Sequence, residues 1–227
     1  AFQHERERQV NDMNLLDLRN AVKDRLAIRS DGSGNSLDGL ITDAYVNTSI
    51  DDALNRVSME REWWWLATTA TLSFDIVDGD DAVPADFMRA QQLVINDAPV
   101  EYVPLDSFLN PNSDTGAFVY TIYGTNIKIT PIPSTVTAGT LYYFRNEPAL
   151  STQASPDTKS PIMPVVYHKI LVAYASHLCS ARRQDEQRAS LYLQEYGNFL
   201  DSMRDDNRTT TQRRIKYNRN LSYATWS

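Results

Sequence analysis

Hydrophobic positions along the chain change their period twice, and these changes predict its architecture. Apolar residues recur every three or four positions over residues 12–29 and 41–65, as they do on one face of an amphipathic helix. From Ala67 onwards apolar and polar residues alternate instead, which is typical of half-buried strands. The helical period returns over residues 165–183 and 185–204. The sequence therefore predicts an α+β fold, in which a helical bundle of about four helices is built from both chain ends and an antiparallel β-sandwich or barrel module is inserted between them.

The same pattern divides the chain into four segments. Thr42 or Asp43 can cap the second helix by accepting a backbone N–H bond. Three prolines between residues 151 and 164 indicate a linker from the β module back to the helices. The predicted segments are the first half of the bundle at residues 1–66, the β module at 67–158, the second half of the bundle at 159–205 and an extended basic C-terminal segment at 206–227.

Turn residues divide the β module into strands. Residues 71–76 alternate between polar and apolar and predict the first strand, and a turn follows at residues 78–81. Hairpins are predicted around residues 96–99 and 124–126, where Asn, Asp, Gly or Pro interrupt apolar runs. The remaining predicted elements are a short helix at residues 105–109 and a strand at residues 140–145.

Charge is unevenly distributed along the chain. The formal net charge is −7, but no Asp or Glu follows Asp206, so residues 207–227 carry +5 and residues 1–206 carry −12. An acidic body argues against tight nucleic-acid binding, which needs Lys and Arg to displace counterions from phosphates. The basic segment is either a solvated terminus or a segment that orders on binding a partner, and it can still contact nucleic acid. Its candidate contact residues are Arg208, Arg213, Arg214, Lys216, Tyr217, Arg219, Leu221, Tyr223 and Trp226.

Bulk properties limit the class of protein further. Hydrophobic residues make up 42% of the chain, enough for a packed core, but no apolar run approaches the ~20 residues that cross a bilayer. The first residues are charged and lack the apolar region of a signal peptide. A single cysteine, Cys179, excludes an internal disulfide framework. We therefore expect synthesis in a cytoplasm and no membrane association.

No motif for catalysis or cofactor binding stands out. His168 and His177 are nine residues apart, on opposite sides of a helix, and no paired metal motif accompanies them. The carboxylates of residues 75–81 lack the ligand order of a calcium loop, which favours a solvated turn. Cys179 lies among apolar helix residues, as inert buried thiols do, and the sequence holds no phosphate loop or nucleophile elbow. The sequence predicts no enzyme, no cofactor and no metal site, and it leaves open a pair of carboxylates that meet only in space.

Three consecutive tryptophans end the second predicted helix. Trp63, Trp64 and Trp65 cannot all face the core, because neighbouring helix residues point ~100° apart. We expect one or two of them to pack inside. Trp63 and Trp64 are candidate interface residues, because tryptophan is enriched at binding hot spots.

The order of several motifs resembles the head-to-tail adaptor proteins of tailed bacteriophages, the connector or tail tubular protein A-like family. Residues 41–43 open a helix that leads to the three tryptophans, and the segment VPADFMR at residues 83–89 is similar to the LPADFxR element of that group. The resemblance covers roughly residues 12–205. Further matching segments are Pro99–Val103, Tyr120–Ile122, Ile127–Pro131, Gly139–Arg145 and the closing helices near Tyr167, Asp185 and Tyr192.

The resemblance implies a structural role in the virion, at the head–tail junction. Proteins of this family form rings, typically of twelve copies, beneath the portal, and they carry no catalytic residues. The implied partners are the portal protein and the next neck or tail protein, and DNA passes through the lumen without specific binding. The acidic body fits this role, because like charge suppresses contact with phosphates.

Two other functions are weighed against the adaptor. A tail terminator or tail tube protein also forms a ring, but helices at both chain ends argue against it, since tube proteins are mainly β. A virion-associated hydrolase of glycans or peptides would need a buried pair of carboxylates with perturbed pKa values. The sequence gives no reason to prefer the hydrolase.

Overall fold

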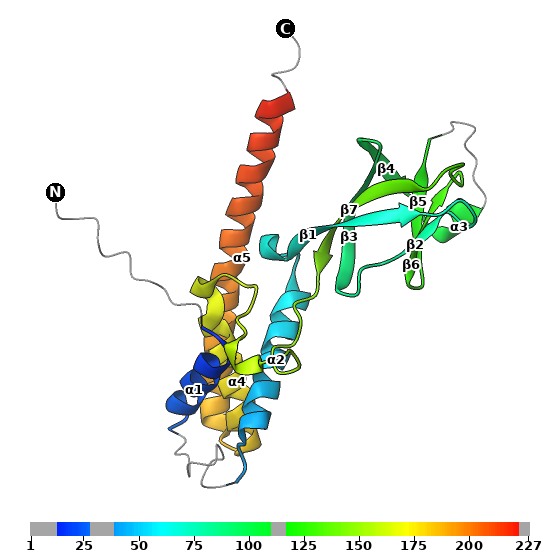
Figure 1. Ribbon diagram of the computed structural model, residues 1–227. Coiled ribbons are helices and arrows are strands. Elements are labelled where there is room, and N and C mark those ends of the chain that lie inside the picture. Colours follow the sequence, from blue (N-terminus) through cyan, green and yellow to red (C-terminus); the bar gives the residue numbers. More distant parts are fainter. Residues whose placement is uncertain (1–12, 28–38, 110–116, 223–227) are drawn as a thin grey trace, which may run out of the picture. The chain divides into compact units, whose positions relative to one another are not determined.

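The computed structural model describes residues 13–27, 39–109 and 117–222, with the backbone alone for residues 209–222. The chain folds as two compact units. The helical unit consists of Ala1–Trp65 and Glu147–Ser227, and the β unit consists of Leu66–Asn146. Because the β unit lies between the two halves of the helical unit in the sequence, the predicted α+β fold with an inserted β module is confirmed (Figure 1).

Helix α4 is the centre of the helical unit. Nine of its fifteen residues are buried, and several of them are Ala, Ser or Cys, whose small side chains let neighbouring helices approach closely. It packs against each of the three other α-helices that the structure describes in this unit. None of the described helices is long and apolar enough to cross a membrane. The four α-helices in the described part of the unit are α1 (Leu15–Arg25), α2 (Asp43–Glu60), α4 (His168–Arg182) and α5 (Glu186–Ser222).

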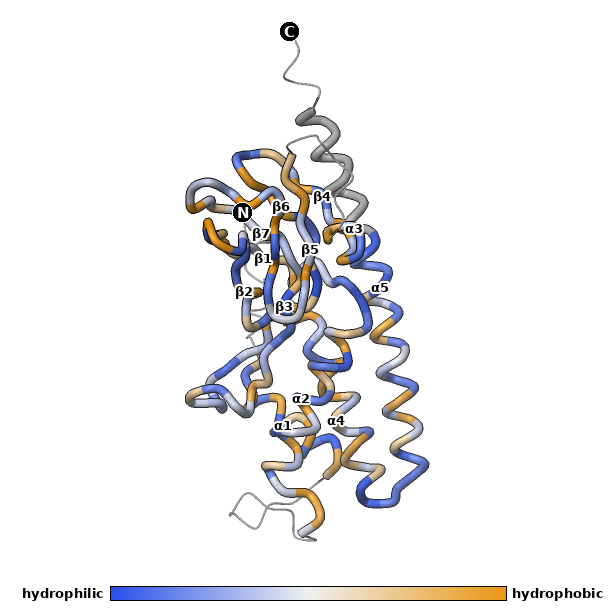
Figure 2. Tube along the Cα trace, turned by 90° about the vertical axis from the view of Figure 1, so that its right-hand side faces the viewer, coloured by the Kyte–Doolittle hydropathy of each residue, from blue (hydrophilic) through white to orange (hydrophobic). Residues whose placement is uncertain are grey.

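Helix α5 packs against the rest of the helical unit through a stripe of buried residues. These residues are three or four positions apart, which is the period of an amphipathic helix. Figure 2 shows the corresponding alternation of hydrophobic and hydrophilic positions along the coloured part of α5. The opposite face is exposed to solvent over the same length. The buried stripe consists of Ala189, Tyr192, Tyr196, Leu200, Met203 and Asn207.

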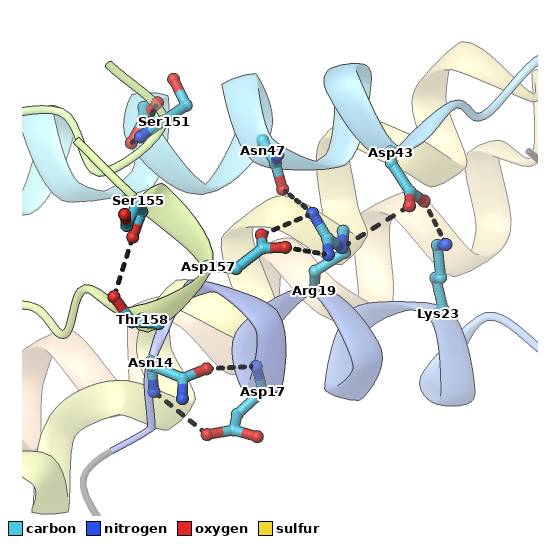
Figure 3. A network of polar contacts seen from close by, with 11 residues as sticks. Asn14, Asp17, Arg19, Lys23, Asp43, Asn47, Ser151, Ser155, Asp157 and Thr158 are labelled. Atoms are coloured by element: carbon cyan, nitrogen blue, oxygen red, sulfur yellow. Dashed lines mark hydrogen bonds and ion pairs between the residues drawn. The ribbon is translucent and has the colours of Figure 1, made fainter. Parts of the chain in front are cut away.

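Arg19 connects three separate segments of the helical unit (Figure 3). It lies on α1 and is only 9% exposed. Its guanidinium contacts Asp157 of the short 3₁₀ helix η2 (Pro156–Thr158) at 3.0 Å and Asp43 at the start of α2 at 3.7 Å, and Lys23 also pairs with Asp43. A planar guanidinium can serve several acceptors at once, which an ammonium cannot do in the same fixed geometry.

We expect Arg19→Met to lower the free energy of unfolding of the helical unit by about 2 kcal/mol, because Asp43 and Asp157 lose a charged donor that is itself nearly buried. Urea titration followed by circular dichroism measures this change. Arg188→Met is the matched control, since Arg188 pairs with Asp185 at an exposed site and should change stability by less than about 0.5 kcal/mol. Equal losses in both variants would contradict the role given to Arg19.

Seven strands form the β unit in the described residues, in the order β1-β7-β3-β4-β5-β6-β2. All neighbours pair antiparallel except β4 and β5, which run parallel over two residues. The outer strands also meet, because Ser73 N–H of β1 donates to Asp81 Oδ2 of β2 at 2.6 Å, so the sheet is a nearly closed barrel. The strands are β1 (Ala67–Phe74), β2 (Asp80–Ala82), β3 (Phe87–Ile95), β4 (Ala98–Tyr102), β5 (Val119–Tyr123), β6 (Asn126–Thr130) and β7 (Thr137–Arg145), with the short helix α3 (Leu105–Leu109) between β4 and β5.

The core of the β unit is packed around Gly139 of β7. A side chain at this position would place its Cβ 2.9 Å from Phe74, 3.2 Å from Ile95 and 3.3 Å from Leu93, so only glycine leaves these residues room. The buried cluster consists of Leu72, Phe74, Leu93, Ile95, Val100, Tyr120, Ile127, Ile129, Leu141 and Tyr143.

Several predicted element bounds differ from those observed. The β5–β6 hairpin is confirmed around residues 124–125, as is the short helix at 105–109. The first strand ends at Phe74 rather than residue 76. The other predicted hairpin has a two-residue turn, Asn96-Asp97, with both φ values positive, so Ala98 and Pro99 already belong to β4.

The second helix ends at Glu60, not at Trp65 as the apolar pattern predicts. Arg61 is extended, and this frees the carbonyl of Val57, which a further helical turn would use. The indole Nε1–H of Trp63 donates to that carbonyl at 2.5 Å. Helix α2 is thus terminated by a buried side chain.

The prediction of an extended segment from residue 206 is wrong for the described backbone, since α5 continues to Ser222. No proline or glycine occurs after Gly197, so nothing in the sequence stops the helix where the apolar period weakens. The sequence predicts an end at Arg204 because apolar residues become rare there. Their loss removes packing contacts, but the hydrogen bonds within the helix do not depend on them.

The β unit ends at Asn146, earlier than the predicted module end at residue 158. Carboxylates bind the following segment to the helical unit. Asp51 of α2 accepts the N–H of Leu150 at 2.7 Å, and Glu147 accepts the N–H groups of Ile162 and Met163. Side-chain acceptors of this kind leave no signal in the hydrophobic pattern.

Candidate partner-binding surfaces

Helix α5 carries most of the predicted basic contact residues. It is 37 residues long, which corresponds to about 56 Å. Arg208 is exposed on it, and the backbone continues as helix to Ser222 (Figure 1). Tyr223 and Trp226 lie outside the described residues. Arg213, Arg214, Lys216, Tyr217, Arg219 and Leu221 lie on the helical part whose backbone alone is described.

A set of polar contacts fixes α5 where this basic part begins. Asn207 is buried, its Oδ1 accepts the N–H of Trp64 at 3.2 Å, and its Nδ2 donates to the carbonyl of Glu62 at 3.2 Å. Arg204 pairs with Glu60 at the end of α2. Asn207 and Arg204 therefore hold α5 firmly against the segment that follows α2.

Tyr167 adds a further contact to the same part of α5. Its hydroxyl donates to Asp206 Oδ2 at 3.1 Å. Burial and this bond raise the pKa of Tyr167 to about 12, so the phenol keeps its proton at neutral pH and remains a donor.

The three tryptophans divide into two environments. Trp63 is fully buried and stacks on Trp65 with ring centroids 4.9 Å apart, and Trp65 in turn contacts Tyr167. Trp64 is half-buried and meets Trp65 edge to face at 5.7 Å. The expectation that one or two tryptophans pack inside is confirmed. Trp63 cannot contact a partner from within the core. Of the two tryptophans predicted as interface residues, only Trp64 therefore remains a candidate.

Four large aliphatic residues are exposed at one end of the β unit. Ile76 is 54% exposed, Val77 71%, Ile132 52% and Val136 66%. We call these four residues the distal patch, because they lie at the end of the β1–β7 pair opposite to Ala67 and Arg145, where the chain enters and leaves the unit. The alternation over residues 71–76 predicts a buried strand face for Ile76, while Val77, Ile132 and Val136 belong to none of the elements predicted from the sequence.

Backbone contacts bring the loops of the distal patch together. Phe74 pairs with Thr137, which places the end of β1 beside the start of β7. Ile129 N–H donates to the carbonyl of Gly79 at 2.8 Å, and Ile132 lies against Gly79, whose φ of +62° favours glycine. The loops after β1 and after β6 therefore form one surface.

Asp75 fixes the loop that carries Ile76 and Val77. Its Oδ1 accepts the N–H groups of Val77, Asp78 and Gly79 at 3.1, 2.8 and 2.9 Å. The bond from Asp78, followed by those from its neighbours, lowers the pKa of Asp75 below its ordinary value of 3.8. The ionised carboxylate of Asp75 therefore stabilises this loop. The stabilisation is fully present above pH 3.8, the ordinary pKa of the group, and it is lost as the pH falls through the lowered pKa of the folded protein.

We expect Asp75→Ala to speed amide hydrogen exchange at residues 77–79 by about tenfold at pH 7, because three N–H groups lose a charged acceptor. The difference from the unchanged protein should shrink as pH falls below 3.8 and the native carboxylate is protonated. Asp78→Ala is the control, because the described Asp78 side chain accepts none of these bonds. Equal exchange in both variants would refute the role of Asp75.

The histidines and the cysteine, which are the candidate residues for chemistry in the sequence, have structural contacts. His168 Nε2 lies 2.9 Å from the carbonyl of Met163, and His177 Nδ1 lies 2.9 Å from that of Ala189. Cys179 is buried as predicted, and burial raises the pKa of its thiol to about 11. Among the described residues, no group of three or more His, Cys, Asp or Glu side chains could hold a metal ion.

An open groove lies on the described part of the helical unit. Met59 and Glu60 of α2 form part of it, and Arg56 lies over the ring of Tyr174 at 5.3 Å. Tyr174 raises the pKa of Arg56, so the guanidinium stays charged. The groove is lined by Asp52, Asn55, Arg56, Met59, Glu60 and Tyr174.

A helical unit interrupted in the sequence by a β unit is the architecture implied by the phage adaptor proteins that the sequence motifs resemble. A family model described as SU10 adaptor protein matches residues 13–217. The chain belongs to this family of phage head-to-tail adaptors, which are structural proteins of bacteriophages. No curated protein matches the chain. The match extends along α5 to residue 217, beyond residue 205, where the motif resemblance ends.

Proposed function

We propose that the protein forms a closed ring beneath the portal of a tailed-phage virion, with twelve copies, and that it docks the next neck or tail protein on its other side. The family match over residues 13–217 carries this proposal. In this role the protein acts by binding and channel formation. It needs no cofactor and turns over no substrate. It is made in the host cytoplasm and resides at the head–tail junction.

The basic part of α5 is proposed as the portal contact. Its helical backbone begins at a firmly held point, Asn207, and it contains five cations and no carboxylate. Cations of this kind steer encounter with an acidic partner, and aromatic or aliphatic side chains supply buried contact. Trp64 is proposed as a second contact, because it is the least buried of the three tryptophans.

DNA is proposed to pass through the lumen without specific binding. Residues 1–206 carry a net charge of −12, so a wall of acidic and neutral polar side chains repels phosphates. A ring of this type uses two different, complementary faces of each copy, because its contacts are heterologous.

Electron microscopy of the purified protein, alone and mixed with portal complexes, tests the proposal. We expect rings of twelve copies of the 25.8-kDa chain, stacked on the portal and open along their axis. Native mass spectrometry gives the copy number. Monomers that stay separate in the presence of portals, or rings with a strongly basic channel wall, would refute it.

A further inference from the structure

The distal patch has the properties of a preformed binding surface. Its four aliphatic residues are all more than half exposed, whereas scattered single exposures are the norm on monomers. They lie on loops fixed by Asp75, Gly79 and the buried Pro133, so little conformational freedom is lost on binding. The core cluster in the described part of the β unit includes none of these four side chains.

The charge around the distal patch limits what can cover it. Residues 73–81 contain four aspartates, and neither they nor residues 130–138 contain a lysine or arginine. Lys128 of β6 pairs with Asp80 at 3.1 Å and offsets one of these charges. Like charge therefore disfavours nucleic acid, an anionic lipid surface and the same patch of a second copy.

We propose that the distal patch is the docking surface for the tail-side protein, through a partner surface that presents apolar side chains flanked by Lys or Arg. This inference rests on the proposed function and adds to it which unit faces the tail-side protein and what chemistry that protein presents. The apolar centre supplies the buried contact, and the aspartates on its rim select a basic partner and exclude acidic ones.

The chain itself contains one segment with the same chemistry, residues 207–227 of a second copy. In the proposed ring this segment is already engaged by the portal. The tail-side protein is therefore the occupant that remains, and the experiment separates the two.

Two aspartates placed inside the distal patch test the inference. Rings of V77D/V136D, docked on portals, are mixed with tail complexes purified from disrupted virions, and the fraction that carries a tail complex is counted by electron microscopy. We expect at least a tenfold lower fraction than for the unchanged protein, with portal docking and the thermal melting curve unaltered. Val166→Asp is the matched control, because Val166 lies on the helical unit and is 65% exposed, almost the same as Val136.

A cross-link identifies the occupant directly. Cys179 is buried and its thiol pKa is raised to about 11, so a cysteine introduced by Val136→Cys takes a photo-reactive label selectively. In the assembled complex we expect an adduct with a basic segment of the tail-side protein. An adduct with residues 207–227 of another copy, or with the portal, overturns the inference.

The role of the distal patch and the proposed function of the ring can be refuted separately. Unchanged tail capture by V77D/V136D, with normal portal docking, overturns the distal patch alone. Failure of the unchanged protein to dock on portals overturns the proposed function and this inference with it.

Discussion

Removal of residues 209–227 should abolish docking onto the portal while leaving the helical unit folded. The structure places the cut after Arg208, because Asn207 is buried and bonds to Trp64 and Glu62. The stripe that holds α5 to the unit ends at the same residue, so truncation removes none of the described packing. Co-sedimentation with portal rings measures docking, and circular dichroism checks the fold.

The loss of docking should depend on charge as well as on buried contact. Arg213 and Arg214 can each form bidentate bonds with carboxylates, so R213Q/R214Q should weaken docking strongly at low salt and less at moderate salt, where charges are screened. R182Q/R183Q removes the same charge from exposed residues at the end of α4 and should leave docking unchanged. If the truncated chain sediments with portals as well as the full chain does, the basic part of α5 is not the portal contact.

The periodicity of the sequence predicts the fold class because both types of element bury one face. Val46, Ile50, Leu54 and Val57 are all buried along α2, and Leu72 and Phe74 are both buried in β1. Their spacing follows a local rule. Apolar residues on the buried face recur every three or four positions in a helix and every two positions in a strand. The inserted arrangement of the two units then follows from the order of the segments along the chain.

Element ends and surfaces depend on contacts that no local rule contains. Helix α2 ends where Trp63 takes the carbonyl of Val57, and Glu147 belongs to the helical unit because its carboxylate accepts two distant N–H groups. The distal patch arises because Phe74 pairs with Thr137, 63 residues later in the chain. Apolar residues in loops, such as Val77 and Val136, belong to no periodic pattern, so only the fold reveals that they share a surface.

Trp63 and Trp64 are adjacent in sequence and should differ sharply in their contribution to stability. Trp63 is fully buried, stacks on Trp65 and terminates α2 through its indole N–H. Trp63→Ala leaves a cavity and an unsatisfied carbonyl, and we expect a loss of about 4 kcal/mol in the free energy of unfolding of the helical unit. Trp64 is half-buried and has one edge contact with Trp65, so Trp64→Ala should cost about 1 kcal/mol.

Urea unfolding of the two variants, followed by circular dichroism at 222 nm, measures the difference. The N–H of residue 64 that donates to Asn207 is a backbone group, so neither substitution removes this donor. Trp63→Ala, however, removes the packing that positions this backbone. We therefore expect faster amide exchange around residues 204–207 in Trp63→Ala than in Trp64→Ala, since the segment that holds α5 loses its support. Similar stability losses in the two variants would mean that the tryptophans act as one aromatic cluster, and the division between a core residue and a surface residue would be wrong.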